Sequence, residues 1–144
     1  MRQFSIATII TLLMFLVSTV YAQTGTVAVK VTQINVKKGG KVKIGIYDSK
    51  GFPVVGKEAD GIELEVKGTS ATYVFKKISV GKYAIAVFQD ENVDGKLNKN
   101  VFGAPKEPYG FSNNKYGMFG PPDFEDVSFD VKEDISISLT INLK

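Results

Sequence analysis

The stretch GKYAIAVFQ, residues 81–89, decides the fold class of this chain. Its side chains alternate between two sets that are both apolar: Tyr83, Ile85 and Val87 form one set, and Ala84, Ala86 and Phe88 form the other. A period of two is typical of a β-strand, and a strand with two apolar faces is covered on both sides. The stretch therefore predicts the central strand of a β-sheet.

Further segments favour an all-β fold. Apolar residues recur at every second position in most of them, and turn residues separate them; they are residues 27–31, 42–46, 62–66, 71–78, 124–131 and 135–143. About seven strands at this spacing predict an antiparallel sandwich of two sheets, with a small barrel as the alternative. We expect 27–31 to pair with 42–46, and 124–131 to pair with 135–143 through a turn at 132–134.

The first 22 residues are expected to be a signal peptide. A positive start precedes an uncharged apolar run over 4–20, and Val20-Tyr21-Ala22 matches the small-residue pattern that signal peptidase requires. Cleavage before Gln23 leaves a single domain, residues 23–144. An uncleaved anchor is the alternative, because the run is close to the ~18 residues of a spanning helix. We expect an exported protein, periplasmic or secreted, with no stable membrane insertion after cleavage.

The composition excludes several kinds of chemistry. The 144 residues include no Cys, His or Trp, and the one arginine is Arg2. Thiol chemistry, disulfides, His-based catalysis and His-ligated metals are therefore excluded. Without the signal peptide, 17 lysines oppose 15 acidic residues, and the small positive excess is spread along the chain. Because nucleic-acid binding needs a clustered basic face, we expect no nucleic-acid partner.

A long irregular segment, residues 90–123, begins with a pattern typical of calcium loops. Oxygen donors occur at loop positions 1, 3, 5, 7 and 9, and they are supplied by Asp90, Asn92, Asp94, Lys96 through its backbone carbonyl, and Asn98. Gly95 at position 6 permits the sharp bend, and hard oxygen ligands favour calcium over transition metals. The segment predicts a calcium site with a dissociation constant of about 10⁻⁴ to 10⁻³ M.

Two features distinguish this loop from an EF-hand. Position 12 is Val101 rather than a bidentate glutamate, and no helix pattern flanks the loop. A further ligand would have to come from Glu91, Asn100, Glu107, Asp123 or water. The alternative interpretation is that Asp, Asn and Gly only form turns after the strand.

The rest of the long segment is rich in aromatic residues and turn formers. One interpretation is a packed, Ω-like loop in which four rings close one end of the sandwich: Phe102, Tyr109, Phe111 and Phe119. The other interpretation is a contact surface for a sugar or a protein partner, formed by Tyr109, Phe111, Asn113 and Asn114.

Three blocks of the chain resemble an exported bacterial family of unknown function. They are GKYAIAVFQDEN with DGKL over 81–97, GAPKE with YGFSNN over 103–114, and PPDFED over 121–126. The resemblance implies a small β-sandwich over 24–144, with a transthyretin-like or immunoglobulin-like outline, and it implies no activity. Histidine is common in that family where this chain has Gln89, and an acid is common where it has Asn98. These departures imply that position 89 needs no imidazole and that calcium binding is weaker here.

Two functions are consistent with the sequence. The first is an exported, non-catalytic binding or structural module, stabilised by calcium through the 90–98 loop, with an unidentified extracytoplasmic ligand or protein as its partner. The second is a carboxylate-based hydrolase such as a glycosidase, in which Asp123, Glu125 and Asp126 supply the acid and the base. A deep apolar cleft with two carboxylates favours the hydrolase, and a flat or convex loop surface favours the module. We expect the module, because the sequence assembles no catalytic constellation.

Overall fold

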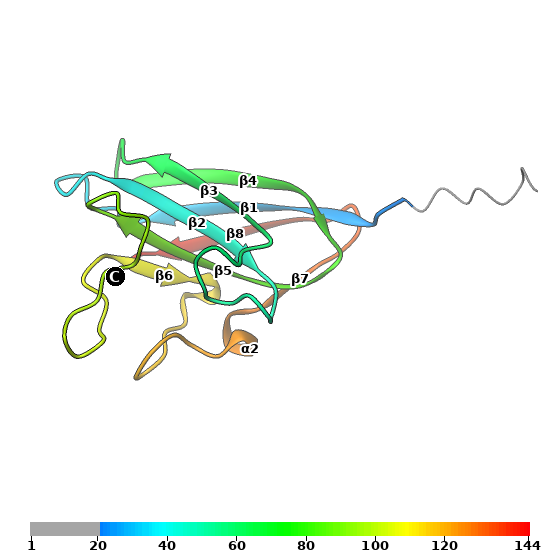
Figure 1. Cartoon of the computed structure of the whole chain (residues 1–144). Helices are drawn as coiled ribbons and strands as arrows, with labels where there is room; N and C mark the ends of the chain where they lie inside the picture. Colours follow the sequence, from blue (N-terminus) through cyan, green and yellow to red (C-terminus); the bar gives the residue numbers. More distant parts are fainter. Residues whose placement is uncertain (1–20) are drawn as a thin grey trace, which may run out of the picture.

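The computed structural model describes residues 21–144, so the predicted signal peptide lies almost wholly outside the described residues. The described chain forms eight strands in two sheets that pack face to face (Figure 1). The elements are β1 (Thr24–Thr32), β2 (Lys41–Tyr47), β3 (Asp60–Glu65), β4 (Ser70–Ser79), β5 (Gly81–Asp90), β6 (Tyr109–Phe111), the 3₁₀ turn η2 (Ser112–Asn114), the short helix α2 (Phe124–Val127), β7 (Phe129–Val131) and β8 (Ser136–Asn142). No helix in residues 21–144 is long and apolar enough to cross a bilayer.

The two sheets differ in their pairing. The three-stranded sheet has the order β4–β1–β8, in which β1 runs antiparallel to β4 and parallel to β8. The five-stranded sheet has the order β3–β2–β5–β6, and β7 also pairs with the first residues of β5. All of its pairings are antiparallel. The predicted two-sheet sandwich is confirmed, with one parallel pair inside it.

The core lies between the sheets and follows the predicted alternation. Val27, Val29 and Val31 of β1 are fully buried, in one cluster with Ile44 of β2 and Ile85 of β5. β5 has hydrogen-bonded neighbours along both of its edges. The prediction that residues 81–89 form a central strand is therefore confirmed.

The first predicted strand pairing is wrong. Residues 27–31 do not pair with 42–46, because β1 and β2 belong to opposite sheets. The connection between them contains Gln33 at a φ of 61° and Gly40 at a φ of 77°, and it carries the chain over the end of the core. Alternation predicts which face of a strand is buried, but it does not predict which strand lies beside it.

The predicted hairpin over 124–143 is also wrong. In the described chain β7 pairs with β5 while β8 pairs with β1, and residues 124–127 form α2 rather than strand. The short connection between β7 and β8 crosses from one sheet to the other. Asp134, at a φ of 54°, donates its backbone N–H to the carbonyl of Thr24 at 3.0 Å and so fixes this crossing.

The outer face of the five-stranded sheet, which points away from the core, is covered over only part of its area. A second apolar cluster forms this cover: Phe52, Ala84, Phe111, Phe124 and Val127. Ser112, which is fully buried, fastens the cover to β5, because its Oγ accepts the N–H of Ile85 at 2.9 Å and bonds to the carbonyl of Val127. The remaining area of the outer face holds the candidate site.

Candidate functional site

Asp90, the last residue of β5, organises the predicted calcium loop. It is 1% exposed, and its Oδ1 accepts the backbone N–H of Asp94 at 3.1 Å while its Oδ2 accepts that of Gly95 at 2.8 Å. Gly95 has a φ of 81°, which glycine adopts without steric cost. Both Asp90 oxygens therefore hold amides of the loop and fix its bend.

The other predicted ligand side chains converge on the Asp94 carboxylate. Asn98 and Asn92 donate their side-chain N–H groups to its Oδ2 at 2.9 and 3.1 Å, and the backbone N–H of Lys96 donates to its Oδ1 at 2.9 Å. These bonds, that of Asn98 first, hold the pKa of Asp94 below its ordinary value of 3.8. A half-turn of either amide would present its oxygen in place of its nitrogen.

Glu107 closes this loop from the far end of the segment. It is 5% exposed, and its two oxygens accept the backbone N–H groups of Glu91 and Asn98, both at 2.9 Å. Two other residues considered as a further ligand are engaged elsewhere: the Glu91 carboxylate meets Lys38 at 3.7 Å, and the Asn100 Oδ1 accepts N–H groups of its own turn. Within residues 21–144 no three acidic side chains gather as a metal-binding group, so a cation here depends on amide and carbonyl oxygens as well.

A cleft of about 860 Å³ lies on the open part of the outer face. Small residues of three neighbouring strands line its base: Gly45 of β2, Gly61 of β3 and Ala86 of β5. Gly45 stands opposite both of the others in the sheet register. A Cβ at Gly45 would lie 2.6 Å from Cε2 of Tyr47, so the tyrosine ring lies across the glycine. The base of the cleft is therefore low and flat, with the Tyr47 ring lying over the small residues.

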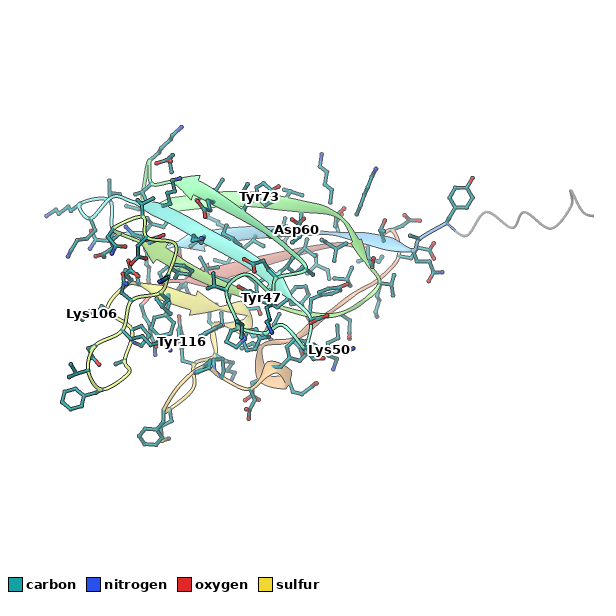
Figure 2. All side chains as sticks on the ribbon, in the orientation of Figure 1. Tyr47, Lys50, Asp60, Tyr73, Lys106 and Tyr116 are labelled. Carbon is teal, nitrogen blue, oxygen red and sulfur yellow. The ribbon has the colours of Figure 1, made fainter. Side chains whose placement is uncertain are left out.

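Two loops wall the cleft and project on the same side of the sandwich, residues 96–105 in yellow-green and residues 117–121 in orange (Figure 1). Figure 2 shows Tyr47 and Tyr116 on this side of the molecule, far from Tyr73 of β4. The loop tips carry apolar side chains that are almost completely exposed: Phe102 at 91%, Met118 at 87% and Phe119 at 98%. All three line the cleft, whereas Val101, at 93% exposed, does not.

The charged residues of the cleft are partly paired. The Glu63 carboxylate meets Lys43 at 2.7 Å through Oε1 and Lys41 at 3.5 Å through Oε2, and the hydrogen bond from Lys43 is the main cause that lowers the pKa of Glu63. Glu58, by contrast, has a buried Oε2 without a hydrogen-bond partner. Burial, and then the neighbouring Glu58 charge, raise the pKa of Tyr47 to about 12.

Residues 29–138, from β1 into β8, match a family described as "Uncharacterized protein conserved in bacteria". The chain belongs to this bacterial family, DUF2141. The DUF2141 match includes strands of both sheets, the 90–98 loop and the residues that line the cleft. The resemblance to a bacterial family of unknown function is thereby confirmed. No curated protein and no solved structure matches the chain.

Two of the four residues predicted to contact a partner line the cleft of this DUF2141 protein. Phe111 is 6% exposed and packs edge-to-face on Phe52, with ring centroids 5.7 Å apart. Tyr109 packs in the same manner on Tyr116 at 5.8 Å. These packed rings support the covered end of the cleft.

The other two of those residues bind the protein's own backbone. The side-chain amide of Asn113 donates to the carbonyls of Asp126 and Ser128 at 3.3 and 3.2 Å. Asn114 donates its side-chain N–H to the carbonyl of Thr140 at 2.9 Å and accepts the N–H of Asn142 at 2.8 Å. Both residues lie outside the cleft lining and fasten the long segment to the rest of the sandwich.

The carboxylates considered for a hydrolase also lie outside the cleft. Asp123, Glu125 and Asp126 are exposed around α2, and Glu125 meets Lys82 at 3.1 Å. The carboxylates that do line the cleft are Glu58 and Glu63.

Sequence reasoning missed the cleft, although one signal for it was present. The second apolar set of residues 81–89 was explained only by a central position in the sheet, but part of that set faces the cleft. The expectation that Phe102 and Phe119 pack against the sandwich is wrong, because both rings stand at exposed loop tips. Gln89 is fully buried and bonds to the backbone of Asn35 and Gly39, so its role is structural.

Proposed function

We propose that this protein is an exported, non-catalytic binding module that holds its ligand in the cleft on the outer face of the five-stranded sheet. The cleft itself carries the proposal. Its volume of about 860 Å³ falls in the range of small-molecule sites, roughly 300–1,000 Å³. Apolar residues normally avoid full exposure in groups, so Phe102, Met118 and Phe119 on the two loops that line the cleft favour contact with a ligand.

The cleft contains two carboxylates, Glu58 and Glu63, which is the arrangement expected to favour the hydrolase, but the pairing of Glu63 supports a non-catalytic role. Glycoside hydrolysis needs one carboxylic acid with a raised pKa and a second carboxylate with a free oxygen. The pKa of Glu63 is lowered rather than raised, and lysines hold both of its oxygens. The chain also contains no His or Cys that could act as an alternative base or nucleophile.

Calcium bound by the 90–98 loop stabilises one wall of this cleft. The loop runs directly into the wall, since Lys96, Leu97 and Lys99 line the cleft. The convergence of Asn92, Asp94 and Asn98 supports a cation site, and rotation of the two amides would present oxygens to the ion. The apolar start of the sequence supports export to the periplasm or beyond, where millimolar calcium suits a weak site.

Binding of paired fluorescent probes to the processed protein, isolated after export, tests the proposed function. The probes are the anion 8-anilinonaphthalene-1-sulfonate and its neutral analogue N-phenyl-1-naphthylamine. We expect at least one probe to bind saturably, and we expect Phe102→Ser to weaken it about tenfold through loss of an aromatic contact. Val101→Ser is the matched control, because it removes an equally exposed apolar residue from the same loop but outside the cleft. Absence of saturable binding, or equal losses in both variants, contradicts the proposal.

A further inference from the structure

The charges of the cleft differ between its two ends. Near Lys43, at the start of β2, lie the loop residues Lys96 and Lys99, and the Lys43 Nζ lies 3.8 Å from the position of a Cβ on Gly95. Lys43 is neutralised by Glu63 at 2.7 Å. Within the described part of the chain neither Lys96 nor Lys99 forms a salt bridge. This end therefore presents two lysines that no salt bridge holds, although the charge of Lys96 also acts on the neighbouring Asp94.

The other end of the cleft offers a hydrogen-bond acceptor. Glu58 lies beside Gly61 there, with its Cγ 3.2 Å from the position of a Cβ on that glycine, and Gly61 pairs with Gly45. Its buried Oε2 has no donor among the described residues. A buried acceptor without a donor is unfavourable, so a ligand that supplies an N–H or O–H group gains affinity at this place. From Lys43 to the Gly45–Tyr47 end of β2 the separation is about 7–13 Å, at ~3.3 Å per residue.

The surface between these ends suits a flat apolar body. The ring of Tyr47 lies across Gly45, and Ala86 beside it carries only a methyl group, so a planar ligand can lie on this low, flat base. Phe88 of β5 and Phe102 of the 96–105 loop also line the cleft. The site thus combines one basic end, one acceptor end and a flat apolar middle.

We propose that the cleft binds a small amphipathic anion: a flat apolar body with a carboxylate or sulfonate at the Lys96–Lys99 end and a hydroxyl or amino donor at the Glu58 end. This inference rests on the proposed function, and it adds the chemical class of the ligand. Charge complementarity and the unpartnered Glu58 oxygen favour this occupant over a neutral lipid or a sugar. A membrane surface would instead contact all of the exposed tip residues, Val101 included.

The two fluorescent probes provide the first test, since their aromatic bodies are the same and only one carries a sulfonate. We expect the anion to bind the processed protein about tenfold more tightly than the neutral analogue, as charge-assisted bonds are stronger than neutral contacts. In the double variant Lys96→Gln/Lys99→Gln this preference should disappear while the affinity for the neutral probe stays unchanged. Lys106→Gln is the matched control, because Lys106 lies on the same segment and outside the cleft lining.

Displacement of the anionic probe tests the acceptor end. We expect 6-hydroxy-2-naphthoate to compete at about a threefold to tenfold lower concentration than 2-naphthoate, because its hydroxyl can donate to Glu58. In Glu58→Met the two competitors should become equal, and a melting curve checks that the variant is folded.

The outcomes separate this inference from the proposed function. Equal binding of both probes in the cleft, with no effect of the lysine substitutions, overturns the anion preference and leaves the binding module intact. Failure of both probes to bind saturably overturns both. Equal losses of vesicle binding in Val101→Ser and Phe102→Ser, measured on phosphatidylserine vesicles, would identify a membrane surface as the occupant and overturn the inference.

Discussion

The two faces of the five-stranded sheet have opposite roles although both are apolar. On the inner face, Ile44, Ile85 and Val87 are at most 2% exposed and fill the space against the other sheet. On the outer face, Gly45 and Ala86 occupy the alternate positions and leave a cleft. Because β2 and β5 contribute to both faces, the room for the cleft comes from the small side chains at Gly45 and Ala86. Large β-branched residues build the core, and small residues leave room for a ligand.

The outer face of the three-stranded sheet shows what an ordinary solvent-facing surface of this protein looks like. Its strands present short polar or charged side chains there, such as Lys30, Ser138 and Thr140. An outer face with Gly, Ala and aromatic residues is therefore specific to the sheet that carries the cleft.

The largest expected effect concerns the inner face. Ile85→Ala should lower the free energy of unfolding by about 2–4 kcal/mol, because it removes buried methyl groups and leaves a residual void. Ala86→Ser, one residue along on the outer face, should change it by about 0.5 kcal/mol or less. Urea unfolding of both variants measures the contrast. Equal effects at the two positions would remove the distinction between the faces.

Calcium bound to the 90–98 loop is expected to stabilise the wall of the cleft on the outer face. If the 90–98 loop binds it only in the folded state, calcium at about 100 times the dissociation constant should stabilise the protein by roughly 2.7 kcal/mol. Asp94→Ala should abolish most of this increase and leave the metal-free protein folded, since Asp94 is an exposed loop residue. The calcium hypothesis is falsified if the melting temperature is the same in millimolar calcium and in excess chelator.

Ser112 links the covered part of the outer face to the central strand. Ser112→Ala should cost about 1–3 kcal/mol, because it leaves the buried N–H of Ile85 and carbonyl of Val127 without this partner. Ser128→Ala is a suitable control, since that hydroxyl makes one exposed bond, to the carbonyl of Glu125 at 3.1 Å. A Ser112 variant as stable as its control would show that the cover is held by its aromatic packing alone.

The smallest effect concerns the titration of Asp94. NMR titration should give its carboxyl a pKa below the ordinary value of 3.8, and Asn98→Ala should raise that pKa toward 3.8. Because the folded-state pKa is depressed, the stabilising contribution is present above pH 3.8 and is lost as the pH falls through the lower, folded-state pKa. Equal pKa values in the two proteins would show that Asn98 does not bind Asp94 in solution.

The sequence predicted which face of each strand is buried more reliably than it predicted which strands pair with each other. Alternation in 27–31, 42–46 and 137–143 correctly marked the residues that point into the core, because burial acts on each strand separately. It was wrong for Ile135, which is 50% exposed. It failed for strand pairing, because the connections at 33–40 and 132–134 cross between the sheets through positive-φ residues such as Asp134. These connections contain the same kinds of turn-forming residues as a hairpin, so their composition does not show that they cross between sheets.

For the candidate site, too, local sequence patterns predicted only part of the arrangement. The side chains of Asn92 and Asn98 bond to the Asp94 carboxylate, whereas Asp90 holds backbone amides of the loop, and the calcium site itself stays a prediction. The cleft depends on loops 96–105 and 117–121 standing on one side of a sheet, and each loop is far from Gly45 in sequence. No local pattern records that arrangement, and only the absence of large side chains at Gly45 and Ala86 hints at it.

Methyl NMR of the processed protein, titrated with 8-anilinonaphthalene-1-sulfonate, tests most directly whether the outer face is the binding face. Ala86 and Met118 line the cleft, whereas Ile85 lies outside the cleft lining with its side chain in the core, so neighbouring residues of β5 report on opposite faces. We expect the methyl signals of Ala86 and Met118 to shift in a saturable manner while the methyl signals of Ile85 stay in place. Saturable binding with an unmoved Ala86 methyl signal, or shifts that are as large at Ile85 as at Ala86, would contradict the assignment of the cleft as the ligand site.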